Sequence, residues 1–214
     1  MVIFKKKYAY LQDKKDIMEK KKLSVTAIVL IVLAVIVVWG ISAYNGLVKS
    51  EEGVKTAWSQ VENVYQRRAD LIPNLVATVK GYAAHESETL EGVVAARAKA
   101  TQMTVNADNL TEEQIAEFQK AQGELGSALG RLMAISEAYP DLKANQNFRD
   151  LQAQLEGTEN RIAVERKAYN QAARDYNTSI RVFPKNIIAS VFGFKSKGYF
   201  EAQEGAQTAP KVEF

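Results

Sequence analysis

His85 is the only histidine in the chain, and Glu86 follows it, which is how the zinc-binding motif of many helical metalloproteases begins. That motif needs a second histidine four residues later, where this chain has Thr89. A single imidazole cannot supply the nitrogen ligands of such a site, and the chain has no cysteine to supply thiolates. We therefore expect His85 to have a surface or helix-capping role.

Acidic residues are the other groups that could do chemistry, either by binding a divalent cation or by acting as acid and base. The candidates are Glu86, Glu88, Glu91, Glu113 and Glu117. Carboxylates at this spacing are ordinary on solvated helix faces, and no glycine-rich phosphate loop or cleft-forming sequence accompanies them. Without cysteine, thiol nucleophiles, disulfides and iron–sulfur clusters are also excluded. We expect no catalytic residues, no metal, no cofactor and no enzymatic activity.

The elements that position any site are expected to be helices, since only four prolines punctuate 214 residues and the long proline-free runs favour long helices. Between Leu23 and Val48 the only ionisable group is Tyr44, and the run from Ala27 to Trp39 is entirely apolar. About 20 apolar residues match the ~30 Å hydrocarbon core of a bilayer. A cleaved signal would have a shorter apolar region and a better cleavage site. The sequence predicts a retained transmembrane helix over residues 23–44, with the lipid bilayer as a partner.

Charge is unevenly distributed along the chain. Residues 1–22 hold eight lysines against three acidic residues, a net charge of +5, so the formal charge of +3 leaves −2 for the rest. The positive-inside rule then predicts a basic cytoplasmic tail over residues 1–22 and a large C-terminal region on the other side of the membrane. A start at Met18 instead of Met1 would give the same orientation. The slightly acidic remainder gives no reason to expect nucleic acid.

Beyond the membrane segment, apolar residues recur at three-four spacing, the pattern of helices packed side by side. One such seam runs from Val54 to Tyr82, with Arg68 as a polar member. A second seam begins after Thr111, which starts a capping-box pattern, and a third begins after Pro140. The predicted fold is all-α, an antiparallel long-helix bundle of the four-helix type over residues 45–200. Whether residues 45–101 form one helix kinked at Pro73 or two helices is left open.

Two further features of this region carry expectations. Gly123, Gly126 and Gly130 are expected to permit a close helix crossing. The segment from 183 to 200 is rich in large apolar side chains, which would cap the core, dock another subunit or touch the membrane. The candidate docking patch is Phe183, Ile187, Ile188, Phe192, Phe194 and Phe200. Residues 201–214 are expected to be a flexible tail.

Several ordered motifs resemble the LemA family, over roughly residues 23–200. They are AWSQVEN (57–63), RRADLIPNL (67–75), GYAAHE (81–86), ENRIA (159–163) and Phe183-Pro184. The resemblance implies a bacterial protein with one N-terminal membrane helix, a helical-bundle domain and no established enzymatic activity. Combined with the orientation predicted from the lysines, this gives a single-pass protein of the inner (cytoplasmic) membrane whose C-terminal domain is extracytoplasmic or periplasmic. Genes of the family often lie beside those of a membrane metalloprotease, which suggests an envelope protease among its partners.

The family motifs also hold opposite charges on segments that should pack together, which predicts a polar network between helices. Such a network would fix the register of the bundle rather than add much stability. The competing interpretation is that the same residues line a groove for a ligand or a partner. The candidate residues are Arg67, Arg68, Asp70, Glu159, Asn160, Arg161, Glu165, Arg166, Asn170 and Asn177.

These observations favour a membrane-anchored interaction or scaffold protein of the bacterial cell envelope. We expect it to act by homo-oligomerisation, by binding other membrane proteins, or by both. The alternative is an extracytoplasmic ligand- or cell-wall-binding module, or an unrecognised enzyme, that uses polar residues between the helices. The sequence does not name the partner, the stoichiometry or the physiological role.

Overall fold

The computed structural model describes residues 2–201, and no strand occurs among them. The chain divides into two compact units, Met1–Gly46 and Leu47–Phe214. Helix α1 (Val2–Tyr82) contributes to both units, and each unit is treated by itself below. Apart from Glu201, the tail expected over residues 201–214 lies outside the described residues.

The first unit contains the apolar part of α1. Its large apolar side chains are exposed almost without interruption from Val25 to Ile41. The most apolar 18-residue window here has a mean hydropathy of 2.9, and α1 is the one described helix that is long and apolar enough to cross a membrane. The other described helices all lie in the second unit.

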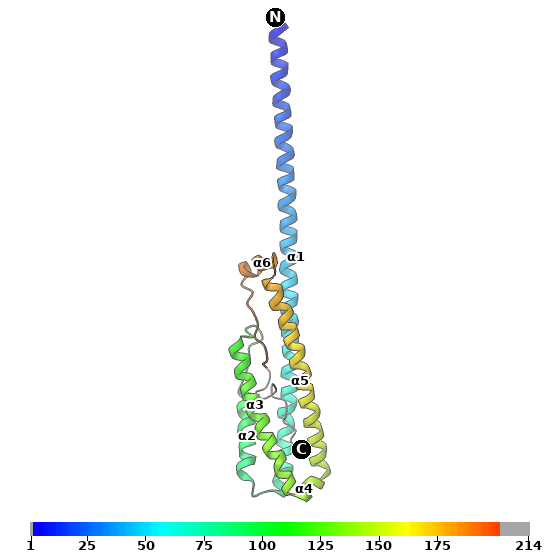
Figure 1. The fold of residues 1–214 in the computed structure, drawn as a ribbon, viewed down its shortest axis with the longest axis vertical. Coiled ribbons are helices and arrows are strands. Elements are labelled where there is room, and N and C mark those ends of the chain that lie inside the picture. Colours follow the sequence, from blue (N-terminus) through cyan, green and yellow to red (C-terminus); the bar gives the residue numbers. More distant parts are fainter. Residues whose placement is uncertain (1, 202–214) are drawn as a thin grey trace, which may run out of the picture. The chain divides into compact units, whose positions relative to one another are not determined.

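The second unit is a helical bundle. Its long helices are the remainder of α1, α2 (Ser87–Gln102), α3 (Glu112–Ile135) and α5 (Gln146–Arg181); shorter ones are the 3₁₀ turn η1 (Ser136–Ala138), α4 (Pro140–Ala144) and α6 (Lys185–Phe192). Within this unit α4 and α6 lie at opposite ends (Figure 1). The predicted fold class, a long apolar N-terminal helix followed by a helical bundle, is confirmed.

The first segment of the bundle is two helices rather than one. Helix α1 ends at Tyr82 and α2 begins at Ser87, so the chain turns just after Gly81. Pro73 does not end α1, although it cannot donate a hydrogen bond to the carbonyl of Ala69. Arg97 of α2 replaces the missing donor, because its Nε lies 2.7 Å from the Ala69 carbonyl oxygen. The α1–α2 hairpin thereby satisfies the group that proline leaves open.

We expect Arg97→Met to lower the free energy of unfolding by about 1.5 kcal/mol, because the Ala69 carbonyl loses a charged donor. In a Pro73→Ala background the new backbone N–H can take that role, so the same substitution should cost less than half as much. Urea titrations of the four proteins in detergent, followed by circular dichroism, give the coupling. Equal costs in the two backgrounds would show that Arg97 does not serve this carbonyl.

Helix ends and glycines follow local rules, with one departure. Thr111 and Asn145 cap α3 and α5 through their side-chain oxygens. Gly193 ends α6 with φ +76°, the left-handed conformation that favours glycine. The close crossing expected at Gly123, Gly126 and Gly130 is absent: a Cβ at any of the three would meet no outside atom within 4 Å. The α3 side of the core is formed by larger apolar residues and two alanines, not by these glycines: Ile115, Phe118, Ala121, Leu125, Ala128, Leu129 and Leu132.

The core consists of two apolar clusters stacked along the bundle. One includes Trp58, Phe118 and Tyr169; the other includes Leu75, Leu125 and Phe148. Helices α1 and α5 pack antiparallel in a steady register. Trp58 contacts Tyr169, with ring centroids 5.5 Å apart, and ten residues further along α1 Arg68 meets Glu159, ten residues earlier in α5. The seam read from the sequence therefore supplies most of the buried residues of α1.

Candidate functional site

A polar layer separates the two apolar clusters. Arg68 is only 3% exposed, and its Nη1 lies 2.9 Å from Glu159 Oε1. Its Nη2 donates to both the backbone and the side-chain oxygen of Gln122, and its guanidinium lies 4.9 Å from the centre of the Tyr65 ring. Each of α1, α3 and α5 thus contributes one polar residue at the same level. A buried ion pair of this kind specifies register, since misaligned helices would leave the charge unpaired.

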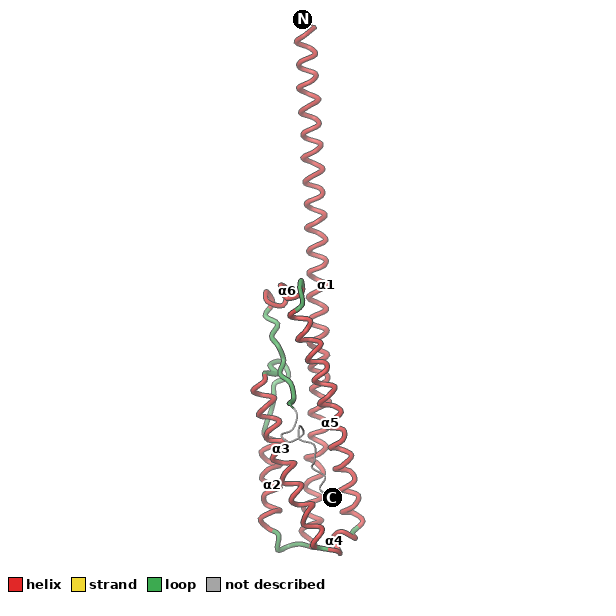
Figure 2. Tube along the Cα trace, viewed as in Figure 1, coloured by secondary structure: helices red, strands yellow, loops and turns green. Residues whose placement is uncertain are grey.

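A second polar assembly involves the segment after α6. Residues 194–201, called the strap here, run as an extended loop back along the bundle (Figure 2). Three side-chain amides each bind the backbone N–H and C=O of one strap residue. The pairs are Asn177 with Lys197 (both 2.8 Å), Asn170 with Phe200 (2.9 and 2.8 Å) and Gln119 with Glu201 (both 3.1 Å). These amides make the hydrogen bonds to the strap backbone that a neighbouring β-strand would make in a sheet.

These amide contacts, called the backbone clamps here, are spaced to suit both α5 and the strap. Asn170 and Asn177 are seven residues apart, which is about 10.5 Å along a helix. Lys197 and Phe200 are three residues apart, which is about 10 Å in an extended chain. One face of α5 therefore binds an extended segment that runs antiparallel to it.

Three strap residues fit the bundle by their side chains, or by the lack of one. Phe200 lies among aromatic rings, 5.9 Å from Trp58 and 5.4 Å from Tyr169 between centroids. A Cβ on Gly198 would lie 2.7 Å from the Cα of Glu112, so only glycine fits there. The buried Lys197 places Nζ 2.8 Å from Glu51 and 2.9 Å from the carbonyl oxygen of Asp108. Recognition of the strap thus combines backbone clamps with a base, a glycine and an aromatic ring.

The residues named from the sequence as one network separate into three groups. Arg68 and Glu159 form the polar layer. Arg166, Asn170 and Asn177 bind the strap instead, and Arg166 Nη2 donates to the Glu201 carbonyl at 2.7 Å. The other five are Arg67, Asp70, Asn160, Arg161 and Glu165: the structure describes the first four as exposed and Glu165 as half-buried. Asp70 accepts from Gln66 of its own helix.

The candidate docking patch is also divided. Phe200 is 5% exposed and belongs to the core, and Phe194 and Ile188 are half-buried against it. Phe183, Ile187 and Phe192 are exposed, as is Val191, which the sequence had not placed in the patch. Ile187 and Val191 lie one turn apart on one side of α6, whereas Phe183 precedes the helix. Some apolar residues of this region therefore pack in the core, and the others lie at the surface.

The part of the chain that resembles known proteins contains both the polar layer around Arg68 and the strap. The model of the LemA family matches residues 57–214. The chain belongs to the LemA family. It is 31% identical over 182 residues to magnetosome protein MamQ 2 of Paramagnetospirillum magneticum, across 77% of this chain and 67% of the relative. It is 24% identical over 160 residues to protein LemA of Metamycoplasma hominis, across 75% and 69%.

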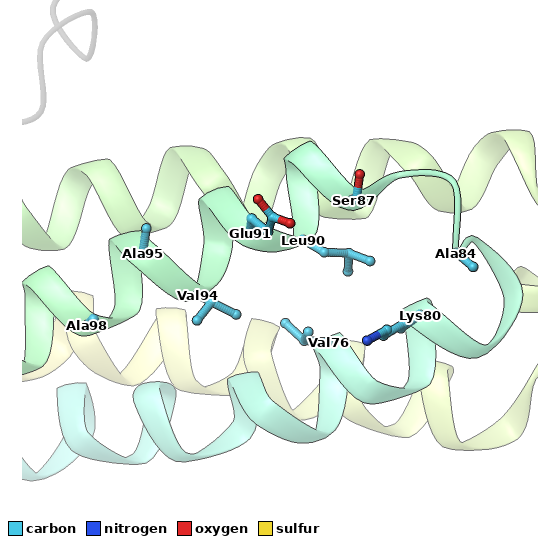
Figure 3. A pocket seen from close by; sticks show the side chains of 9 residues that line it. All are labelled: Val76, Lys80, Ala84, Ser87, Leu90, Glu91, Val94, Ala95 and Ala98. Carbon is cyan, nitrogen blue, oxygen red and sulfur yellow. The ribbon is translucent and has the colours of Figure 1, made fainter.

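Two surface hollows complete the description of this LemA-family bundle. The first, of about 380 Å³, lies between α1 and α2 and has Val76, Leu90 and Val94 on its walls, with Lys80 and Glu91 beside them (Figure 3). The second, of about 480 Å³, lies between α1 and α5 and is more polar, with lining residues that include Asn74 and Asp150. His85 is exposed in the α1–α2 loop, and among the described residues no group of three acidic or histidine side chains could hold a metal.

The LemA-family core buries three tyrosine side chains, which makes its stability sensitive to alkaline pH. Burial raises the pKa of Tyr65 and Tyr169, and raises the pKa of Tyr176 from its usual 10.0 to about 12. The folded state favours the neutral phenols, so stability is fully present below pH 10 and falls as the pH rises toward 12, where only the unfolded chain ionises freely. The thermal midpoint should be constant up to pH 10 and fall above it.

A matched variant tests this assignment. The hydroxyl of Tyr176 is buried and has no hydrogen-bond partner in the structure, so Tyr176→Phe removes a titrating group without breaking a bond. This variant should be at least as stable as the parent at neutral pH and should lose less of its thermal midpoint above pH 10. An identical alkaline loss in both proteins would place the sensitivity elsewhere.

Proposed function

We propose that this LemA-family protein is a membrane-anchored scaffold of the bacterial cell envelope that acts by binding and self-association. The apolar stretch of α1 is the anchor in the cytoplasmic membrane. The lysine-rich segment before it favours a cytoplasmic N-terminus, which leaves the bundle on the extracytoplasmic side. Homo-oligomers, and complexes with other membrane proteins such as an envelope protease, are the assemblies that this arrangement would serve.

The observation that carries the proposal is the groove that holds the strap. Peptide-binding proteins capture extended chains through main-chain hydrogen bonds and side-chain pockets, and the groove has both. Its backbone clamps are Asn177, Asn170 and Gln119, and its pocket is the aromatic cluster that receives Phe200. A strap from a second copy would make the same contacts, so exchange between copies needs no new interface. Gly193 at the end of α6 is the hinge for such an exchange.

Disulfide trapping tests the exchange, because the chain contains no cysteine of its own. Gln119→Cys and Glu201→Cys place two thiols where the strap ends on α3. The two single variants, each with a different affinity tag, are produced together in the same cells and the membranes are oxidised. Exchange between copies yields a covalent dimer that carries both tags.

The controls show whether a missing dimer means that the two cysteines cannot meet or that the strap is not exchanged. A chain with both substitutions must form the disulfide, within or between copies, which shows that the two positions meet. Asp141→Cys, on α4, paired with Glu201→Cys in separate copies should give no dimer. If the double variant closes within single chains and the mixed singles remain monomeric, self-association by strap exchange is wrong.

The membrane orientation is tested with the same cysteine-free background. A single cysteine at Asp141 should react with a membrane-impermeant maleimide added to the extracytoplasmic side, whereas one at Asp13 should react only after the membrane is opened. The reverse pattern would contradict the proposed orientation and leave the strap exchange untouched.

A further inference from the structure

The exposed face of α6 is strongly apolar for a surface helix. Phe183, just before α6, is 75% exposed, and Val191 is 73% exposed; Ile187 and Phe192 are exposed as well. Within α6, Ile187 and Val191 lie one helical turn apart and form a stripe on its surface, and Phe183 lies two residues before the helix begins. The opposite side of α6 packs inward through Ala189 and Ile188. Such a helix, apolar outside as well as inside, requires a covering partner.

The register of the bundle places this stripe at the end of the bundle where the chain of α1 enters it. The α1–α5 pairing of Trp58 with Tyr169, continued for eleven residues, brings Leu47 level with Ile180, and both are buried in the same cluster. Phe183 is three residues beyond Ile180. Tyr44, which ends the predicted transmembrane segment, is three residues before Leu47, so the chain between them spans at most about 11 Å whatever its conformation.

The charges around α6 match a lipid surface. From Tyr176 to Phe200 the sequence has four basic residues and no acidic one. Arg181, Lys185 and Lys195 are exposed, whereas Lys197 is buried in the strap contacts. Apolar and aromatic side chains flanked by lysine and arginine are the composition of helices that lie in the interfacial layer of anionic bilayers.

We infer that the stripe of Ile187 and Val191, together with Phe183 just before α6, lies in the interfacial layer of the bilayer that α1 crosses. The occupant of this face is lipid, with the exposed basic side chains at the level of the headgroups. This inference rests on the anchoring proposed above. It gives the bundle a second attachment, so that the end of the bundle bearing α6 is held against the membrane surface rather than tethered by one helix.

The test uses the full chain in vesicles that contain phosphatidylglycerol, with a single cysteine carrying an environment-sensitive fluorophore. The fluorophore is placed at Val191 on the stripe, at Asp141 on α4 as a solvent control, and at Val35 in the apolar stretch as an anchoring control. Lipids with nitroxides near the headgroup should remove most of the emission at Val191 and little at Asp141. Emission at Val191 should also shift to shorter wavelength than at Asp141.

The outcomes distinguish this inference from the proposed function. If lipids with nitroxides deep in the acyl chains quench Val35 and no lipid quencher affects Val191, the protein is anchored and the contact of α6 with lipid is wrong. A blue-shifted Val191 fluorophore that lipid quenchers do not reach would mean that a second copy covers the stripe. If Val35 is not quenched either, the anchoring itself fails and the inference fails with it.

Discussion

Replacing Glu159 by alanine is expected to lower the free energy of unfolding of the bundle by about 3 kcal/mol. The substitution leaves the guanidinium of Arg68, which is 3% exposed, without its counter-ion. Glu159 itself is about half exposed, so water can reach part of the site, and the cost lies at the low end for a broken buried pair. Urea titration in detergent micelles, followed by circular dichroism, measures the loss.

Replacing Arg68 by methionine should cost less, about 1–2 kcal/mol, because it removes the buried charge and keeps most of the volume. The remaining defect is the Gln122 side-chain oxygen, which loses its donor. Once Arg68 is absent, Glu159→Ala should add almost nothing, so the double variant should be more stable than Glu159→Ala alone. If Arg68→Met costs more than Glu159→Ala, the ion pair does not dominate this layer.

The second large effect is expected at Phe200, the aromatic anchor of the strap. Phe200→Ala should lower the free energy of unfolding by about 3–5 kcal/mol, since it empties a position enclosed by Trp58, Phe118 and Tyr169. The strap should also become accessible, because its remaining contacts are mainly backbone clamps. Urea titration gives the stability, and limited proteolysis near Lys197 gives the accessibility.

Phe183→Ala is the matched control, since it removes the same side chain from a residue that is 75% exposed. In detergent it should change the free energy of unfolding by less than about 0.5 kcal/mol. A large loss at Phe183 with a small one at Phe200 would reverse the assignment of inside and outside for this segment.

The helices of the bundle were predictable because their apolar residues repeat with the period of a packed helix. Trp58, Phe118 and Tyr169 each fall on such a seam, and burial follows the seam directly. Arg68 was recognisable as a polar seam position for the same reason. The turn between α1 and α2 was not decided by the sequence, because Gly81 and the residues after it carry no proline or strong capping signal.

The strap was missed because an extended segment has no helical period and its clamps are side chains of another element. Phe200 therefore looked like part of a continuous apolar patch, although the chain turns inward after Gly193. One signal was present: Asn170 and Asn177 share a helix face at a spacing that three extended residues match. Asn170 and Asn177 were assigned to a network between helices or to a groove for a ligand or partner, and a segment of the same chain was not considered as the occupant.

The strap also sets the order in which the protein can be completed during synthesis. Trp58 leaves the ribosome 142 residues before Phe200, the ring that stacks on it at an interplanar angle of 14°. At usual translation rates this interval is about 7–28 s. The groove on α5 exists only once Asn177 has been made, 23 residues before Phe200, and its aromatic pocket stays open for about the last 1–5 s of this interval. We therefore expect nascent chains to be most prone to aggregation in the interval before Phe200 is made, when a chaperone that binds apolar segments would bind them.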